Sequence, residues 1–437
     1  MTKICTSTSD NIEWFKHNCR CYDLTIRSVV VNEETYFLLF LGGITTSGSV
    51  QPVIQGLATA PDQLIFLNAS VSSVSSLEEA YATMLQGQTI IFKLDVPLCF
   101  AADTRALPGR TTSEPSVEKS IRGSRDGFVE LLMVNLGLIR KRIKAFDLCI
   151  DHKTYGSHSK TDVALFYLDT LVQRDVLDDV KTRLNRISSN VNLQSERELA
   201  DLMYHQWYNP YPHVRFTERP DLVCIHLLQG QIAILVDHCP TAILLPATLF
   251  QCTSQIEEVT QPMLVSMMLR SLRAIGLIVS VFLLPVWICT LEFESFKELF
   301  FFVLQVMAVD GIIEWVRLSL IHSPSILSSM LGMIAVFILG ETAVNFGAYT
   351  QEMLILTAIC NVGNFVTSSY ELSMANKLTR FFLVICTLFY QKAGLAIGCF
   401  AVFLMLITTD TGPVGYLYPF IPFDVQECLR ILKGKKK

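Results

Sequence analysis

Several signatures of enzymes and of secreted proteins are missing from this sequence of 437 residues. None of the motifs G-x-S-x-G, G-x-x-x-x-G-K-S/T, G-x-G-x-x-G and H-E-x-x-H occurs, so we expect no enzyme and no catalytic residue. The segment from Met1 to Asn18 is polar and contains no apolar run of the length that a secretory signal needs. The soluble part of the chain is therefore predicted to stay in the cytoplasm.

Paired cysteines and an excess of basic residues are also missing. The 13 cysteines are scattered without any C-x-x-C, which indicates free thiols in a reducing compartment. His17, Cys19 and Cys21 lie close together, but no second pair follows at zinc spacing, so we expect no metal site and no cofactor. The net charge of −5 argues against a nucleic-acid partner, because nucleic-acid binding needs a basic face.

Charge is scarce in the last third of the chain. Between positions 271 and 408 only 14 side chains are charged, against 53 between positions 1 and 270. About 20 mostly apolar residues in a helix cross a bilayer about 30 Å thick, and a helix satisfies its own backbone polar groups there. Four helical spans are predicted on this basis, at residues 272–291, 326–346, 352–369 and 381–408.

A fifth apolar segment, residues 296–321, differs from the four spans because it contains charged residues. Asp310, Glu314 and Arg317 follow one another at intervals of four and three, which places them on one face of a helix. Such a helix either lies in the membrane interface or packs inside a helical bundle.

Basic residues predict the orientation of the helical part. Arg270 and Arg273 precede the first span, and four of the last five residues are lysine, so both ends are predicted to be cytoplasmic. Four spans with an interfacial helix are compatible with this orientation. An alternative is that residues 296–321 cross the membrane and residues 381–408 form a re-entrant hairpin that bends near Lys392.

Residues 1–255 alternate short β-rich runs with helical patterns, which is typical of an α/β protein. Five strands are predicted, at residues 36–41, 89–94, 163–168, 222–227 and 231–236. Four helices are predicted, at residues 76–85, 125–145, 174–187 and 195–204. Residues 222–250 are apolar but are interrupted by Gly230 and Asp237, so they are predicted to be a buried β-hairpin outside the membrane.

The predicted organisation is an α/β cytosolic domain of two strand-helix lobes, followed by an all-α multispan membrane domain. The lobes are residues 1–102 and 125–255, the linker is 103–124, the membrane domain is 271–410 and the basic cytoplasmic tail is 411–437. When residues 35–57 are laid over residues 162–184 without a gap, ten of the 23 pairs are apolar in both copies. This weak repeat is either a duplication or a chance likeness of two strand-helix units.

The predicted helix at residues 125–145 has an acidic start and a basic end. Ser124 or Asp126 would cap it, and this polarity suits the helix macrodipole. It is either a solvated surface helix or a contact for carboxylates of a neighbouring subunit or for anionic lipid headgroups. The candidate subunit-contact residues are Arg122, Arg125, Asp126, Glu130, Arg140 and Arg142.

Neutral polar residues follow one face of the third predicted span at intervals of four, three and four. A second polar patch, with an interval of four, lies on the preceding span. The candidate pore-lining residues are Thr357, Asn361, Asn364 and Ser368, together with Glu341 and Asn345 of that patch. Two interpretations stay open: the residues line an aqueous path, or they bond helices to one another in a closed bundle. An ionisable group such as Glu341 at that depth is functional by default.

Motifs spread over nearly the whole chain form a specific set. They are RGSRDGF at residues 122–128 with its flanks, QWYNPYPHVRFTERPD at 206–221, LLQGQIAILVD at 227–237, IHSPSILSSMLGMIAVFILG at 321–340, SYELSMANKLTR at 369–380 and YLYPFIPFD at 416–424. As a set they resemble the GerA family, the A subunits of bacterial spore germinant receptors. Two residues depart from the family pattern: Ser124 stands where Pro is usual, and Glu341 stands where Gln is common.

The resemblance implies a protein of the spore inner membrane that acts in germination. Members of the family are thought to form homo-oligomeric, pentameric channels that conduct ions and that work with other membrane subunits, one of which binds the germinant. The leading hypothesis is therefore a subunit of an oligomeric ion-conducting germination complex. The alternative is a non-conducting membrane scaffold that assembles partner germination proteins.

Overall fold

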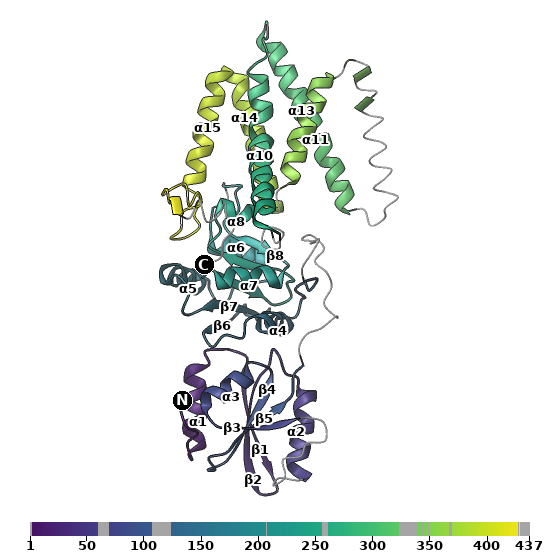
Figure 1. Cartoon of the computed structure of the whole chain (residues 1–437). Helices are drawn as coiled ribbons and strands as arrows, with labels where there is room; N and C mark the ends of the chain where they lie inside the picture. The colour runs from purple at the N-terminus through teal and green to yellow at the C-terminus, as the bar shows by residue number, and fades with distance from the viewer. Residues whose placement is uncertain are drawn as a thin grey trace.

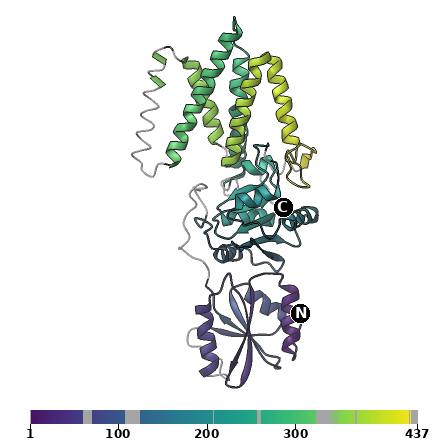
Figure 2. The ribbon, with the colours of Figure 1, turned by 180° about the vertical axis from the view of Figure 1, so that it is seen from behind.

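The computed structural model describes residues 2–59, 70–106, 124–206, 208–255, 261–322, 340–341, 344–345, 347, 349–366, 369–426 and 428. Its parts follow one another along the long axis of the molecule. In Figure 1 a first α/β lobe lies at the bottom, a second lobe in the middle and a group of helices at the top. Figure 2 shows the same order from behind. The predicted class, an α/β part followed by an all-α part, is confirmed.

The first lobe is built on an antiparallel sheet of five strands in the order β1-β2-β4-β5-β3. The strands are β1 (Leu24–Val31), β2 (Glu34–Leu41), β3 (Val71–Val74), β4 (Gln88–Lys93) and β5 (Cys99–Asp103). Helices α1 (Thr8–Asn18) and α3 (Leu77–Met84) cover one face, and α2 (Ser47–Thr59) covers the other. Because both faces are covered, Leu38 and Leu39 of β2 point in opposite directions and are both fully buried.

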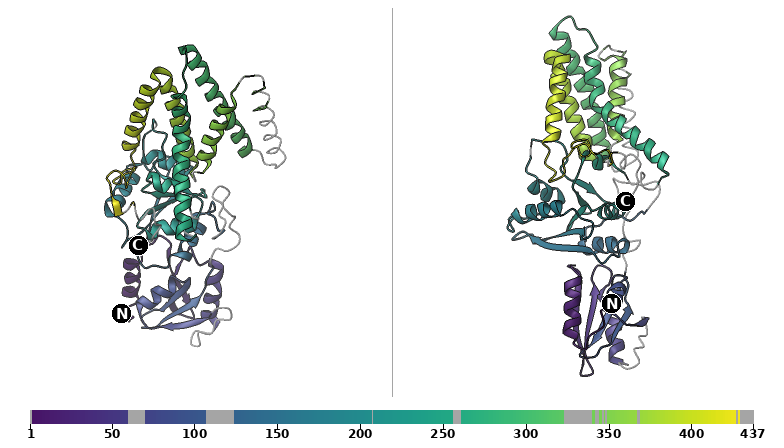
Figure 3. Two further views of the ribbon diagram at one scale, coloured as in Figure 1. Left: turned by 45° about the horizontal axis from the view of Figure 1, so that its top comes forward. Right: turned by 60° about the vertical axis from the view of Figure 1, so that its left-hand side comes forward.

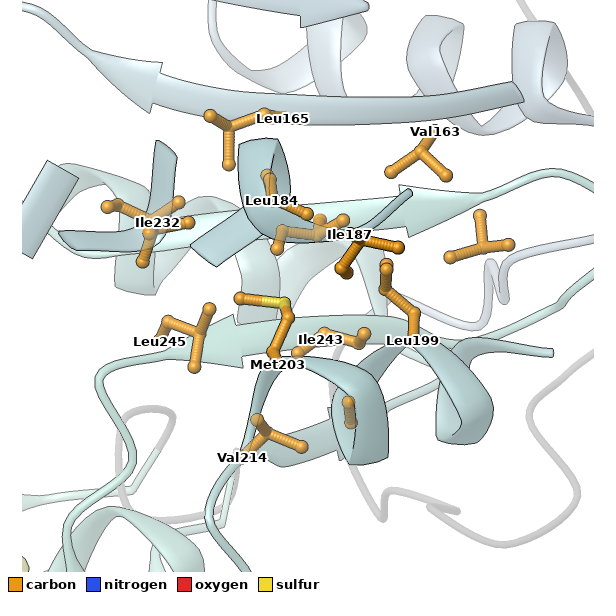
Figure 4. Packing of buried hydrophobic residues seen from close by; sticks show 14 of the residues in the cluster. Val163, Leu165, Leu184, Ile187, Leu199, Met203, Val214, Ile232, Ile243 and Leu245 are labelled. Carbon is orange, nitrogen blue, oxygen red and sulfur yellow. The ribbon is translucent and has the colours of Figure 1, made fainter. Parts of the chain in front are cut away.

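The second lobe repeats this plan. Its strands are β6 (Leu148–Tyr155), β7 (Thr161–Leu168), β8 (Arg215–Thr217), β9 (Ile232–Val236) and β10 (Ala242–Leu245), in the order β6-β7-β9-β10-β8. Helices α5 (Arg174–Arg186) and α6 (Glu196–Met203) cover one face, and α4 (Leu132–Arg142) and α7 (Pro220–Leu228) cover the other. Figure 4 shows the first of these cores, where Leu184, Leu199 and Met203 meet the sheet residues Ile243 and Leu245.

The two sheets therefore share one strand order, in which the third strand of each lobe lies at the far edge. The alignment that lays residues 35–57 over residues 162–184 also brings the start of β2 onto the start of β7, and the start of α2 onto the start of α5. The matching order extends the likeness beyond one strand-helix unit and favours a duplication over chance.

Residues 222–227, predicted as a strand, are instead part of helix α7, so this prediction was wrong. Pro220 lies in the first turn, where a backbone N–H has no partner within the helix, so the N–H that proline lacks costs no hydrogen bond. The helix is buried between α4 and the sheet, so apolar residues surround it and no helical period is visible in the sequence. The hairpin predicted for residues 222–250 is formed by β9 and β10 alone and is followed by the short helix α8 (Leu249–Thr253).

The helix predicted from residue 125 begins only at Leu132, and neither Ser124 nor Asp126 caps it. The backbone of the preceding residues bonds elsewhere: the N–H of Phe128 donates to the carbonyl of Glu218, and Asn135 bonds both backbone groups of Val129. The first turn of α4 is instead capped by Asp237 of the second lobe, whose carboxylate accepts the N–H of Leu132 at 3.1 Å.

The helical part contains α10 (Met263–Ile288), α11 (Phe296–His322), α13 (Gln351–Phe365), α14 (Tyr370–Tyr390) and α15 (Lys392–Ile407), which stand above the second lobe in the right view of Figure 3. By length and composition, three of the described helices could cross a membrane: Met263–Ile288, Phe296–Leu318 and Tyr370–Tyr390. Most of the span predicted at residues 326–346 lies outside the described residues. The span predicted at 352–369 corresponds to α13, which has 15 residues.

The single span predicted at residues 381–408 was wrong, because the chain turns at Gln391 between α14 and α15. Gln391 has a φ of 45°, a left-handed conformation that ends the first helix. The two helices then pack so closely that a Cβ on Gly394 would meet the carbonyl oxygen of Cys386 at 2.0 Å. This turn lies where the alternative prediction placed its bend, beside Lys392.

Candidate functional site

A cluster of charged side chains lies among the membrane helices, and helix α11 supplies its first face. Asp310, Glu314 and Arg317 lie one above another on this helix, as their spacing predicts. Asp310 is 1% exposed, so of the two placements predicted for this segment, packing inside a bundle agrees with the structure. A carboxylate at such a position needs charged or hydrogen-bonding partners, because burial penalises an unpaired charge heavily.

Helix α14 supplies the main partner of Asp310. The guanidinium group of Arg380 donates to both carboxylate oxygens, with Nε at 3.1 Å from Oδ2 and Nη2 at 2.7 Å from each oxygen. The remaining nitrogen, Nη1, donates to the carbonyl oxygen of Ser280 on α10 at 2.8 Å. The Arg380 and Asp310 side chains are each 1% exposed, so the pair joins three helices without contact with solvent.

A second ion pair lies one turn away along the same two helices. Lys377 donates from Nζ to Glu314 at 2.9 Å and to the backbone carbonyl of Asp310 at 3.0 Å. Arg317 lies 3.6 Å from Glu314, donates to Ser373 and covers the ring of Phe365. Three cationic and two anionic side chains thus share the cluster, which has an excess of one positive charge when all five are ionised.

Helix α13 contributes the neutral polar face that the sequence predicts. Asn361 donates from Nδ2 to Asp310 at 2.7 Å and accepts from Arg380 at 3.3 Å, so its amide is part of the ion pair. Asn364 donates to the carbonyl of Ser373 on α14, and Thr357 is fully buried one turn before Asn361. Within one chain this face therefore lies against α11 and α14.

The other candidate pore-lining residues lie elsewhere or are not described. Glu341 and Asn345 are both exposed, and Ser368 lies outside the described residues. Two buried polar atoms near the cluster, Thr357 Oγ1 and Asn376 Nδ2, have no hydrogen-bond partner in the described part of the chain. In the same part, no group of three or more His, Cys, Asp or Glu residues is placed to hold a metal ion.

The candidate subunit-contact residues have different surroundings. Arg140 is buried and makes a bidentate pair with Asp23 of the first lobe, with nitrogen-oxygen distances of 2.7 and 2.6 Å. Arg142 donates to Asp126 at 3.0 Å. Arg125 and Glu130 are exposed, and Arg122 lies outside the described residues. Of these candidates, Arg125 and Glu130 are the described side chains open to a neighbouring molecule.

The second lobe is bonded directly to both ends of the helical part. Arg183 of α5 makes a bidentate pair with Asp410, which follows α15, at 2.9 and 3.0 Å. Burial raises the pKa of Asp410, but the Arg183 guanidinium and the amide of Gly412 outweigh it and lower the pKa overall. About three turns into α10, the first helix of this part, Arg273 donates to the carbonyl of Thr253 at 2.7 Å.

Sequence reasoning found the three charged residues of α11 in this cluster and missed the two on α14. Lys377 and Arg380 are three positions apart, a helical spacing that also includes Ser373, and this polar face was a usable signal for α14. Their pairing with α11 spans 70 residues for Arg380 and Asp310, and no local pattern reports a contact at that distance along the chain.

These features define a class of protein: a membrane protein in which two α/β lobes precede a helical part that buries paired charges. Residues 12–433 match the family described as Bacillus/Clostridium GerA spore germination protein. The chain belongs to this family, which confirms the resemblance seen in its motifs.

Individual proteins of sporulation and of spore germination are similar to this chain over most of its length. The chain is 30% identical to stage V sporulation protein AF of Bacillus subtilis (strain 168), over 98% of this chain and 93% of that protein. It is 24% identical to spore germination protein KA of the same organism, over 92% of this chain and 80% of that protein. A crystal structure of the N-terminal domain of the A subunit of the Bacillus megaterium spore germinant receptor GerK3 aligns with a TM-score of 0.42 and 21% identity, covering 56% of this chain and 96% of that one.

Proposed function

We propose that this protein is a subunit of a germination complex in the spore inner membrane, and that its helices provide a path for ions in a homo-oligomer. Its membership of the GerA family supports the role in germination. The ion pair of Arg380 and Asp310 supports the ion path. Ionisable residues inside membrane helices are expensive and usually mark the route of an ion or a proton, whereas an anchor needs none.

In the closed state of this path, the cluster of charged side chains would block the passage of ions. Arg380 and Asn361 satisfy Asp310, so a permeating ion cannot compete for the carboxylate while the three helices stay in contact. The unpaired Thr357 hydroxyl beside them, which has no partner in the described part of the chain, offers a bonding position to water once the helices move apart. Conduction then requires a displacement of α14 relative to α11 and α13.

The exposed Glu341 and Asn345 would face other subunits around the axis of the oligomer. In a pentamer, as the family resemblance implies, five Glu341 carboxylates would form an acidic ring. Rings of this kind favour cations in channels. The two lobes and residues 411–437 would lie on the cytoplasmic side, next to companion membrane subunits.

A scaffold without conduction is the second candidate function. It is favoured by the hydrogen bonds that the amide nitrogens of Asn361 and Asn364 make within one chain, because such bonds would hold the helices together in any anchor. The scaffold also explains the lobes, since the first lobe lies far from the helices and is free to bind other proteins (Figure 1).

Ion flux separates the two functions. The purified protein is reconstituted in liposomes, alone and with co-purified partners, and the efflux of potassium and of chloride is recorded. We expect efflux from the wild type, a change in its rate for Asn361→Leu, and no change for Val362→Leu, a matched control at an exposed position of the same helix. A wild-type protein that stays oligomeric without any flux under these conditions would leave the scaffold as the function.

A further inference from the structure

Residues 416–425, which follow α15 and are called the apolar loop below, expose several large apolar side chains close together. The exposed side chains are Phe420, Ile421, Phe423 and Val425. Phe423 is 68% exposed, and among the described aromatic side chains only Trp315 of α11 and Tyr390 of α14 are more exposed. Both of those residues belong to helices that could cross a membrane.

The apolar loop is compact, because its polar groups bond within the loop itself. The N–H of Phe420 donates to the carbonyl of Leu417 at 2.8 Å, and the N–H of Asp424 donates to the carbonyl of Pro419 at 2.9 Å. The hydroxyl group of Tyr418 donates to the carboxylate of Asp424 at 3.2 Å. These bonds give the exposed apolar side chains a folded support.

The start of the loop is fixed between the second lobe and the helices. The carbonyl oxygen of Tyr416 accepts the N–H of Leu249 of α8 at 2.9 Å, and the ring centroids of Phe250 and Phe420 are 5.0 Å apart. Tyr416 is buried in one apolar cluster with Leu372, which lies in the first turn of α14. Figure 1 shows this part of the chain in yellow, below α15 and beside the second lobe. The loop therefore lies near the first turn of α14.

Helix α14 indicates where the membrane boundary lies. Its 21 residues rise by about 31 Å, which matches a hydrocarbon core about 30 Å thick. The exposed residues Tyr370 and Tyr390 stand at its two ends, and tyrosine is enriched where membrane helices meet the lipid headgroups. When α14 spans the bilayer, its first turn and the apolar loop lie at the boundary that faces the lobes.

We propose that the apolar loop inserts into the headgroup region of the bilayer on the side of the lobes, with Phe420, Phe423 and Val425 in contact with lipid. Apolar side chains that gather on an exposed surface mark a binding site for a membrane or a protein, and aromatic rings favour the depth of the headgroups. Five basic residues follow in the sequence between positions 429 and 437, a charge that suits anionic lipid. This inference goes beyond the proposed function and does not depend on the ion path.

The contact would also position the second lobe. The loop is bonded to α8 through Tyr416, and the segment before it is bonded to α5 through Asp410 and Arg183. A loop inserted in the bilayer would therefore limit how far the lobe can tilt away from the membrane surface.

Photo-crosslinking from the loop tests the contact. The full-length protein with Phe423→p-benzoylphenylalanine is reconstituted in nanodiscs of phosphatidylcholine and phosphatidylglycerol, irradiated and analysed by mass spectrometry. We expect a gain in mass of one phospholipid, in a yield comparable to that of the same label at Phe400, an exposed residue of α15. The matched control is Phe146, an exposed phenylalanine whose ring packs against Tyr81 of the first lobe at 4.8 Å. The label at Phe146 should give no lipid adduct.

A second label, Val425→p-benzoylphenylalanine, probes the same surface and keeps all aromatic side chains of the loop. Lipid adducts from both labels are the expected result. Crosslinks from either label to a second copy of the chain would make the loop a subunit contact and overturn the proposal, without affecting the proposed role in germination. A yield of lipid adduct no higher than that of the Phe146 label would also overturn it.

Discussion

The hydroxyl groups of Tyr211 and Thr379 lie 3.0 Å apart and share a hydrogen bond, although 168 residues separate them in the sequence. Tyr211 belongs to the second lobe, and Thr379 lies on α14 directly before Arg380 of the charged cluster. Both side chains are buried. The lobe therefore contacts α14, the helix whose Arg380 pairs with Asp310, at the residue directly before that arginine.

A double-mutant cycle should detect this contact. Tyr211→Phe and Thr379→Val each remove one hydroxyl with little change of shape, and we expect a coupling free energy of about 1 kcal/mol between them, the net contribution of a typical hydrogen bond. The measurement is the thermal unfolding of the four proteins in one detergent. Strictly additive changes in stability would show that the two hydroxyl groups do not act as a pair.

The ion pair of Arg380 and Asp310 should respond differently to the loss of one partner and of both. Arg380→Met leaves a buried carboxylate without its main partner, and we expect a loss of about 3–5 kcal/mol in the free energy of unfolding. The double variant Arg380→Met with Asp310→Leu buries no charge there and should recover much of that loss. The measurement is unfolding in detergent, with Val362→Leu as the control. A double variant less stable than Arg380→Met would contradict a simple buried pair.

Helix α7 should lose stability in acid because of His226. Burial lowers the pKa of His226 to about 3, and the Arg215 guanidinium acts in the same direction. The unfolded imidazole titrates near 6.5, so between these values the unfolded state binds more protons and the folded state loses stability as the pH falls. The loss approaches about 1.4 kcal/mol for each pH unit within this window.

Hydrogen exchange of the α7 amides, corrected for the intrinsic effect of pH, measures this loss between pH 7 and pH 5. In His226→Gln the extra acid sensitivity should disappear, while His213 still contributes its own, because burial also lowers its pKa. Equal acid sensitivity of α7 in both proteins would remove His226 as the cause.

A substitution of the exposed Arg125 tests the predicted subunit contact more directly than a substitution of Arg142 does. Arg125→Glu should weaken the oligomer and leave the monomer folded, because this side chain is exposed. Arg142→Glu should also disturb the local fold, since Arg142 is paired with Asp126. Cross-linking and light scattering in detergent measure assembly, and Arg27→Glu, at another exposed arginine, is the control. Undiminished oligomers in Arg125→Glu would remove this residue from the contact.

Some elements could be predicted from the sequence because one local signal dominates them. Helix α5 has a strong apolar stripe in which Val176, Leu177, Val180 and Leu184 face the sheet, and its bounds agree with the prediction to one residue. Helix α6 begins after Ser195, whose hydroxyl accepts from the N–H of Glu198. The strands β1 and β6 were missed, because Arg27 and Ser28 interrupt the apolar run of β1 and β6 is charged in its middle.

Other features depend on contacts between distant residues, and no local pattern contains them. Helix α7 has apolar residues on every side, so its sequence looks like a buried strand. The start of α4 is fixed by Asp237, which lies 105 residues later. The polar face of α13 was predicted, but its partners Asp310 and Ser373 lie on other helices, and only the fold shows that these helices cover it.

The bonds between the second lobe and the helical part have a mechanical consequence. Arg273 fastens α10 to the lobe, Thr379 fastens α14, and Asp410 fastens the segment after α15. One body therefore holds the helical part at three points. A helix held at a single point can slide independently of the lobe, but these points can shift against one another only if one of the bonds breaks. A rotation of the lobe is thus transmitted to α10 and α14 together, as a tilt relative to α11 and α13.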